Sequence, residues 1–354
     1  MSQAALPVVT PSPVRSDAPR IALLMAAGLV LVAVPFFATE YWVNAIVVPF
    51  LILSLAGLGL NLLTGYAGQL SLGSGAFMMV GAYATFAFQL RLPELPLPLA
   101  LVASGVIAGA VGFLFGLPST RIKGFYLIVS TLCAQFFFEW LFLKFPWFYN
   151  ANSSATIALP GGLHLFGLDL NGPHGRYWLT LGVVALSTLL ALNLVRSQTG
   201  RNWMAVRDMD TAAAVIGVPV RRAKLQAFAV SSFLLGIAGA LWAFAYLGSA
   251  SVQSFGLSRS YQILFIIIIG GLGTIRGAYL GAAFVSLLPL GLDWLVQHVF
   301  AGQVDAGVLQ NVQKAIFGAL IIWFLIREPE GLARLLGLRP SGVARRTLFP
   351  SVQR

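Results

Sequence analysis

The feature that most constrains this chain is a run without charged side chains, from Tyr41 to Leu90. As one continuous helix the run would extend about 75 Å at 1.5 Å per residue, whereas the hydrocarbon core of a bilayer is about 30 Å thick. We therefore predict that it crosses a membrane twice. Its middle, from Gly57 to Gly75, is rich in glycine, hydroxyl and amide side chains. Irregular backbone at membrane depth is tolerated only where protein buries it or water lines it, so we predict a functionally central helix break here.

The whole chain shares this apolar character. Of its 354 residues, 58% are hydrophobic and 9% are charged, and the mean hydropathy is +0.86. This composition excludes a soluble enzyme and predicts an all-α, polytopic bundle of transmembrane helices. We predict ten spans, at residues 21–38, 42–63, 74–90, 97–117, 124–145, 177–195, 225–247, 260–273, 278–297 and 311–327. A transmembrane domain at 21–327 would then lie between cytoplasmic tails at 1–20 and 328–354.

The net charge of +11 comes mainly from basic residues in short loops beside apolar spans. With both termini in the cytoplasm, most Lys and Arg residues fall on the inner side. The outer side, or the outer ends of spans, receives Arg91, Lys144, Arg176, Arg259 and Lys314. This asymmetry follows the positive-inside rule, so the expected electrostatic partner is membrane lipid and not nucleic acid.

Metal or disulfide chemistry finds little support in the sequence. Cys133 is the only cysteine and lies in an apolar run, where we expect a small buried hydrophobe. The three histidines, His164, His174 and His298, have no ligand-like spacing, so we predict no metal site.

Two acidic residues, Glu139 and Asp293, lie well inside apolar spans. A charge at such a position is costly and is often functional. Both lie toward the outer ends of their spans, however, where snorkelling or a local partner such as Lys144 or Gln135 would suffice. We favour this structural interpretation.

Glycines recur at helical spacing in several spans. One stripe in the fourth span consists of Gly105, Gly109, Gly112 and Gly116. Gly277 and Gly281 form a second small-residue pair, and both patterns indicate closely packed helices. The segment 270–274 (Gly-Gly-Leu-Gly-Thr) ends an apolar stretch so abruptly that we predict a break or tight turn inside the bundle.

The inner loop at 196–224 carries the signals of a short capped helix. Asp208 or Asp210 is a possible N-cap, the helix would run through 212–216, and Gly217 stands at the C-cap position before Pro219. Its apolar face needs a cover. A groove on another protein and the inner membrane surface both satisfy that requirement, and the residues alone do not choose between them.

Three motifs resemble one known family. The first runs from Asn61 to Gly73 and continues through 75–77 and 81–83; the others lie at 205–217 and 270–282. In this order they closely resemble the M-type permease subunit of branched-chain (hydrophobic) amino acid ABC importers. Family members commonly carry histidine after the first motif's Leu-Gly, whereas this chain has Ser74.

The resemblance implies a permease subunit in a bacterial inner (plasma) membrane. Its implied partners are a second, homologous permease, two cytoplasmic ATP-binding subunits and a periplasmic substrate-binding protein. The chain has no G-x-x-x-x-G-K-[ST] phosphate loop, so it is not itself an ATPase, needs no cofactor of its own and must receive energy from partners that bind ATP. The residues predicted to couple it to the ATPase are Arg207, Asp208, Asp210, Thr211, Ala214, Ile216 and Gly217.

Uncharged polar groups beside the first break are candidates for the translocation pathway. They are Asn61, Thr64, Tyr66, Gln69, Ser71 and Ser74. The alternative is that these groups satisfy one another and the broken backbone. The glycines predicted to shape the breaks and their packing are Gly65, Gly68, Gly73, Gly270, Gly271 and Gly273.

Other functions remain open at this stage. The resemblance also covers importers of urea, short amides or aromatic acids. An ion-coupled secondary transporter would need ionisable pairs at mid-membrane depth, and none lies near the 61–74 break. An intramembrane lipid enzyme would need a convergent cluster of His, Asp or Glu, which the three histidines do not supply.

Overall fold

The structure is a computed structural model. It describes residues 35, 39–92, 95–120, 122, 124–150, 156–158, 164–165, 168–169, 172–299 and 331–335, with scattered positions between 311 and 326. The predicted tail at 1–20, nearly all of the predicted span 21–38, and most of the predicted span 311–327 and tail 328–354 lie outside the described residues.

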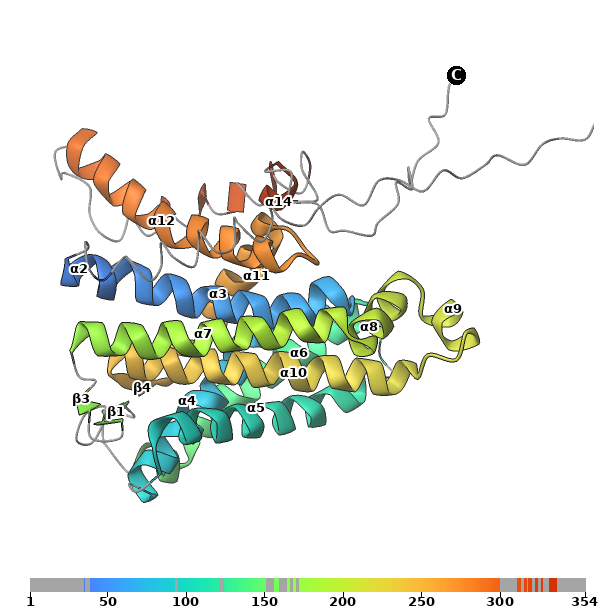
Figure 1. Ribbon diagram of the computed structural model, residues 1–354, viewed down its shortest axis with the longest axis horizontal. Helices are drawn as coiled ribbons and strands as arrows, with labels where there is room; N and C mark the ends of the chain where they lie inside the picture. Colours follow the sequence, from blue (N-terminus) through green and yellow to red (C-terminus); the bar gives the residue numbers. More distant parts are fainter. Residues whose placement is uncertain are drawn as a thin grey trace, which may run out of the picture.

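The long helices lie side by side along the long axis of the molecule (Figure 1). They are α3 (Val48–Asn61), α4 (Ser74–Arg91), α5 (Leu97–Ser119), α6 (Phe125–Lys144), α7 (Pro173–Arg196), α10 (Val220–Leu241), α11 (Leu257–Gly270) and α12 (Ile275–Val299). Two short helices, α8 (Gln198–Asp208) and α9 (Asp210–Val215), project from one end of the bundle. A four-residue helix, α14 (Leu332–Leu335), packs near α11 and α12.

Two of these helices are extended by π-helical turns. The short α2 (Glu40–Trp42) and the π segment η1 (Val43–Val47) lead into α3, which continues into a second π segment, η2 (Leu62–Tyr66). Likewise, α10 continues into η4 (Trp242–Leu247). Such turns are rare and often occur at functional sites.

Seven described helical segments are long and apolar enough to cross a membrane. They are Glu40–Tyr66, Leu97–Pro118, Phe125–Lys144, His174–Arg196, Val220–Leu247, Val252–Gly270 and Ile275–Leu292. Each contains or overlaps one predicted span. The largest displacement is at the predicted span 260–273, which begins at 252 because a 3-10 turn, η5 (Val252–Phe255), precedes α11.

The predicted span at 74–90 is α4, and it begins inside the bundle. The N–H of Ala76 donates to Gln135 Oε1 (2.6 Å), and the N–H of Gly75 donates to Ser260 Oγ (2.8 Å). Gln135 lies near the middle of α6, about 15 Å from each end at 1.5 Å per residue. These two bonds satisfy backbone donors of the first helical turn inside the bundle.

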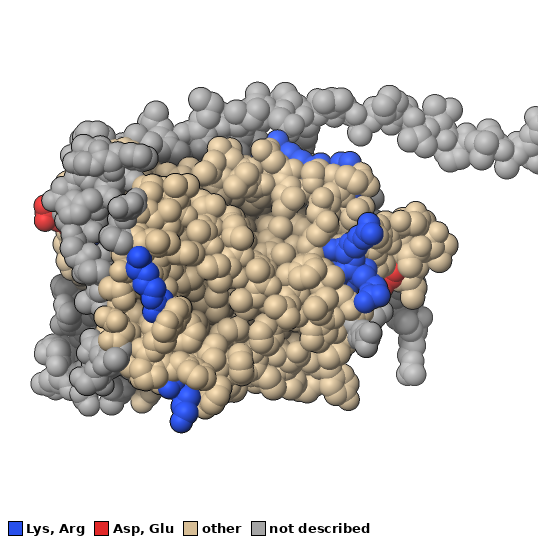
Figure 2. Space-filling view, turned by 90° about the horizontal axis from the view of Figure 1, so that it is seen from below, with Lys and Arg blue, Asp and Glu red and all other residues tan. Residues whose placement is uncertain are grey.

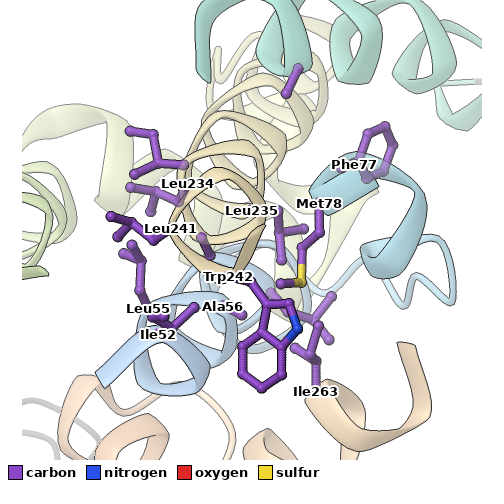
Figure 3. Packing of buried hydrophobic residues seen from close by; sticks show 14 of the residues in the cluster. Ile52, Leu55, Ala56, Phe77, Met78, Leu234, Leu235, Leu241, Trp242 and Ile263 are labelled. Atoms are coloured by element: carbon purple, nitrogen blue, oxygen red, sulfur yellow. The ribbon is translucent and has the colours of Figure 1, made fainter. Parts of the chain in front are cut away.

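The centre of the core is formed by α10. The predicted glycine stripe of α5 faces it: Cβ atoms on Gly105, Gly109, Gly112 and Gly116 would all come close to α10. On the α4 side, a Cβ on Gly239 would overlap the backbone of Met78. The prediction of close helix packing along the α5 stripe is therefore confirmed. Figure 3 shows the resulting cluster, in which apolar side chains of α3, α4 and α11 surround α10 and Trp242.

The outward face of the bundle is apolar between charged ends. In one view of the surface, Lys and Arg side chains lie toward the two ends, and the wide area between them carries no charge (Figure 2). Cys133 is exposed, so the expectation that it is buried is wrong. Hydrophobicity did not distinguish the two cases because a helix face toward lipid is as apolar as one toward the core.

The end opposite α8 and α9 carries short strands and a 3-10 turn, η3 (Pro146–Tyr149). β1 (Thr156–Ala158) pairs antiparallel with β4 (Ser249–Ser251), and β2 (His164–Leu165) pairs with β3 (Leu168–Asp169). The β1–β4 pair ties the long loop after α6 to the segment between η4 and α11.

The close crossing of α4 and α10 leads to a stability prediction. We expect Gly239→Leu to lower the stability of the protein by about 3 kcal/mol or more, because the new side chain would have to displace the α4 backbone. The measurement is the thermal unfolding midpoint in detergent. Gly182→Leu is the matched control, since a Cβ at Gly182 on α7 meets no atom within 4 Å. Equal midpoints for the two variants would contradict the prediction.

Candidate functional site

The break predicted after Asn61 is a non-helical segment, residues 67–73, between η2 and α4. Its polar backbone is satisfied by the protein. The N–H of Gln69 donates to the carbonyl of Leu63 (3.0 Å), and Thr64 Oγ1 donates to the carbonyl of Gln69 (3.1 Å). Further along, the N–H of Leu72 donates to Thr131 Oγ1 on α6 (3.0 Å). The chain can therefore unwind within the bundle without leaving these groups unpaired.

The side chain of Asn61 joins this break to the second one. Its Nδ2 donates to the carbonyl of Thr274 (2.8 Å), and its Oδ1 accepts from the N–H of Gly273 (2.9 Å). A Cβ on Gly65 would overlap both Asn61 Oδ1 and the backbone of Gly273. The predicted break at 270–274 is confirmed as the turn between α11 and α12, and it forms one junction with the end of α3.

Arg207, near the end of α8, closes the same junction. Its Nη1 donates to the carbonyl of Gly65 (2.9 Å), while Nη2 pairs with Asp208 Oδ1 (3.0 Å). Gly68 has a φ of +69°, and a Cβ there would lie 3.2 Å from the Cα of Arg207. Only glycine adopts this backbone easily and leaves room for the arginine. The sequence stretch 196–224 therefore makes direct contact with the break.

The short helix α9 matches the predicted position closely. Gly217 has a φ of +87°, its N–H donates to the carbonyl of Ala214 (3.1 Å), and the N–H of Val218 donates to that of Ala213 (2.9 Å). This is the hydrogen-bond pattern of a glycine C-cap, so that prediction is confirmed.

The predicted N-cap of α9 is wrong. Met209 occupies the N-cap position and makes no side-chain capping bond. Asp210 is the first helical residue, and its Oδ2 accepts from Lys224 Nζ (2.7 Å) on α10. Asp208 pairs with Arg207. Both carboxylates are held by basic partners that loop propensities do not reveal.

The outer surface of α9 is apolar. Met209, Val215 and Ile216 are 60%, 88% and 74% exposed, whereas Ala213 is buried against the bundle. Burying a large aliphatic side chain contributes about 1.5–3 kcal/mol. This short helix therefore presents a hydrophobic tip that a partner surface or lipid could cover.

A small polar cavity of about 130 Å³ lies between the break and the 196–224 segment. Its walls include Gln69, Arg207, Asp210 and Lys224. Gln69 is only 3% exposed, and neither atom of its amide has a hydrogen-bond partner among the described residues. The cavity is large enough for a few water molecules, which could satisfy this amide.

A second polar cluster lies at the start of α4. Gln135 Nε2 donates both to Glu139 Oε1 (2.8 Å) and to the carbonyl of Phe255 (2.9 Å). The prediction that Gln135 is a local partner of Glu139 is therefore confirmed. Ser74 is fully buried beside this cluster, and its hydroxyl has no partner within the described part of the chain. The Asp293 side chain lies outside the described set.

The six predicted pathway residues thus fall into two groups. Asn61, Thr64 and Ser71 bond to the protein, and Tyr66 is in hydrogen-bond contact with the backbone of Ile275. Gln69 and Ser74 have buried polar atoms that no described residue satisfies. For the first group the structural alternative has direct support, and contact with a substrate stays a prediction for all six.

Sequence reasoning missed several residues of these clusters. The α8 helix and Lys224 were included only as parts of a loop, and Ser260 was not singled out. Arg259 was placed on the outer side or at the outer end of a span and was not connected with the site; it lies in the first turn of α11, inside a membrane-length segment. A search for charged residues within 18-residue apolar windows would have found it.

Comparison with known proteins gives one family match. Residues 43–325 match the family described as the branched-chain amino acid transport system / permease component. No solved structure matches the chain.

Three relatives indicate the range of the similarity. The high-affinity branched-chain amino acid transport system permease protein LivM of Escherichia coli K12 is 33% identical over 350 residues, covering 92% of this chain and 77% of the relative. The probable branched-chain amino acid transport permease protein LivM of Methanocaldococcus jannaschii is 22% identical, covering 78% and 89%. The fructose import permease protein FrcC of Rhizobium meliloti is 28% identical, covering 76% and 75%.

The bridge made by Asn61 leads to a second prediction. We expect Asn61→Leu, which keeps the branched skeleton of the side chain, to lower stability by about 2 kcal/mol or more, because the Gly273 N–H and the Thr274 carbonyl lose their partner. The check is the thermal unfolding midpoint in detergent, with Asn193→Leu at an exposed position on α7 as the control. An unchanged midpoint for Asn61→Leu would show that the bridge is dispensable.

Proposed function

The chain belongs to the branched-chain amino acid transport system / permease component family, and we propose that it imports branched-chain or related amino acids as the M-type permease subunit of an ABC importer. The family match covers most of the chain, and the membrane-length helices agree with a multi-pass permease. Placement in a bacterial inner membrane is supported by the bacterial relatives.

The proposed assembly contains a second, homologous permease, two cytoplasmic ATP-binding subunits and a periplasmic substrate-binding protein. ATP binds to the partners and not to this chain. In this assembly the α8–α9 end faces the cytoplasm, and the strand-bearing end faces the periplasm. Basic residues of the described chain support this orientation by gathering at the α8–α9 end. They include Arg196, Arg201, Arg207, Arg221, Arg222, Lys224 and Arg276.

The observation that carries the proposal is the continuous contact from the exposed tip of α9 to both helix breaks. In our mechanism an ATPase groove covers Val215 and Ile216, which lie at the end of α9. The Lys224–Asp210 pair ties α9 to α10, and Arg207 ties α8 to the carbonyl of Gly65.

Asn61 then extends this contact to the turn between α11 and α12. Closure of the ATPases on ATP would displace α8 and α9 and shift this junction between outward-open and inward-open arrangements. Rigid elements with two discrete arrangements are the physical basis on which such coupling rests.

The substrate is the finer part of the proposal. Relatives of this chain include importers named for fructose and for autoinducer 2, so membership of the family does not fix it. Branched-chain or related amino acids are favoured because three relatives that cover 92%, 87% and 78% of this chain are named for them. Urea, short amides and aromatic acids are the alternatives within the same transporter class.

Removing the gene and restoring it from a plasmid tests this function. Uptake of labelled leucine, isoleucine or valine should fall on deletion and return with the plasmid, and two ATP-binding subunits should co-purify with the chain. Purification without any ATP-binding subunit would contradict the importer assignment. If amino acid uptake is unchanged but uptake of urea or an amide is lost, the substrate assignment is wrong and the proposed subunit assembly still holds.

The tip of α9 provides a third prediction. We expect the double variant Val215→Ser, Ile216→Ser to lower co-purification of the ATP-binding subunits at least tenfold, because two exposed apolar side chains can no longer be buried in the groove. The variant should still reach the membrane in normal amount. Gln198→Ser at an exposed position on α8 is the control. Normal co-purification by the double variant would exclude α9 as the docking element.

The Lys224–Asp210 pair provides a fourth. Lys224→Met removes the cation beside a carboxylate that is mostly buried, and Asp210→Asn removes the anion beside a buried ammonium. We expect each single variant to lose more ATPase stimulation by loaded binding protein than the double variant does, because breaking such a pair leaves a poorly solvated charge. Additive losses in this double-mutant cycle would mean that the pair does not act as a unit.

A further inference from the structure

Arg259 is a cation near the middle of the membrane-spanning bundle. It lies in the first turn of α11, within the segment Val252–Gly270. The hydroxyl of the next residue, Ser260, donates to Gln135 Oε1 (3.1 Å), so Arg259 lies at about the same height along the bundle as Gln135. Gln135 is about 15 Å from each end of α6, so Arg259 lies near the centre of a hydrocarbon core about 30 Å thick.

The guanidinium group is held by three neutral contacts. It lies 4.0 Å from the ring centroid of Trp242, Nε donates to the carbonyl of Ser254 (3.3 Å), and Nη1 donates to Gln262 Oε1. Trp242 itself is buried, among side chains that include Ile263 of α11 (Figure 3). The arginine is thus fixed in one position before any ligand arrives.

No carboxylate of the described residues forms an ion pair with Arg259. No carboxylate among the described residues lies within 4.0 Å of Arg259, and its Nη2 has no hydrogen-bond partner there. Arg207 and Lys224, at the α8–α9 end, are each paired with an aspartate. An unpaired charge at mid-membrane depth is costly, and such residues usually face a water-filled path or an ion that passes along it.

The surroundings of Arg259 suit an amphiphilic ligand. Its side chain is mostly buried, with some exposure remaining, and Tyr246 and Leu247 of η4, the segment that begins at Trp242, are 37% and 40% exposed. A fixed guanidinium beside exposed aromatic and aliphatic groups matches a small molecule with a carboxylate at one end and an apolar side chain at the other. The phosphate of a lipid fits poorly, because headgroups lie about 15 Å away from this level.

We propose that Arg259 binds the carboxylate of the transported substrate during its passage through the permease. The inference rests on the proposed importer function and deepens it by restricting the substrate to carboxylates, which excludes urea and neutral amides. Because Arg259 is pre-positioned by Trp242, Ser254 and Gln262, little side-chain entropy is lost when the carboxylate binds. The contact need only be transient, and the substrate carboxylate would pair with a guanidinium that has no ion-pair partner among the described residues.

A charge-restoration experiment tests this. Cys133 is the only cysteine and is exposed, so Cys133→Ser gives a background in which one introduced thiol can be modified. In that background, Arg259→Cys is expected to lower uptake of the labelled amino acid at least tenfold, because a charge-assisted hydrogen bond is lost. Aminoethyl methanethiosulfonate, which attaches an ammonium group, should restore much of the uptake, whereas methyl methanethiosulfonate should not.

The matched control is Arg91→Cys in the same background. Arg91 also stacks on a tryptophan, with 3.5 Å between its guanidinium carbon and the Trp147 ring centroid, but it is exposed at the end of α4. Uptake by this variant should remain normal and should not respond to either reagent. This control tests whether the loss of an arginine–tryptophan contact is by itself enough to lower uptake.

A second measurement separates substrate binding from a structural role. The Arg259→Cys complex should keep its partner subunits and hydrolyse ATP in response to loaded binding protein, while importing little substrate. Normal uptake, parallel loss of ATP hydrolysis and uptake, or restoration by both reagents or by neither would overturn the proposal.

If the Arg259→Cys variant does not assemble, Arg259→Lys takes its place. Uptake below one tenth of normal in an assembled, ATP-hydrolysing Arg259→Lys complex would then overturn the proposal. A parent chain that imports no amino acid would instead refute the proposed function.

Discussion

The structure depends on the amide of Asn61, which pairs with backbone groups of the turn between the neighbouring helices α11 and α12. In a bilayer, an unwound segment is stable only if other parts of the protein satisfy its N–H and C=O groups. Asn61 does this for the turn between α11 and α12 by accepting from Gly273 and donating to Thr274. Gly65 leaves the space that this contact requires. Two breaks that are more than 200 residues apart in the sequence therefore form one junction.

The same requirement explains where the polar clusters lie. Gln135 and Ser260 satisfy the first turn of α4 at mid-depth, and Arg207 bonds to the carbonyl of Gly65 at the α8–α9 end. Most of the conspicuous polar residues of the 57–75 segment are thus used for folding. Gln69 and Ser74, whose buried polar atoms have no partner in the described chain, differ from the rest. So does Arg259, which is held only by neutral groups.

Local sequence patterns predicted much of this architecture. Membrane-length apolar runs located seven of the ten predicted spans, the α5 glycine stripe identified a close helix contact, and Gly217 marked the end of α9. These predictions succeeded because hydrophobicity, helical spacing and glycine caps act over a few residues. The N-cap of α9 and the exposure of Cys133 were predicted wrongly. Each of these depends on which neighbouring helix, or whether lipid, covers a given face.

By itself, the sequence determined that this protein is a bundle of membrane-spanning helices interrupted at two glycine-rich breaks, with the motif order of an importer permease. Its long uncharged, apolar runs are stable in a lipid bilayer and not in water. Only the tertiary structure decided that the two breaks meet, that α4 starts at mid-depth, and that α8 contacts the break through Arg207. Those features arise from hydrogen bonds between residues distant in sequence, and a one-dimensional pattern contains no information on which distant backbone group a buried amide or guanidinium will reach.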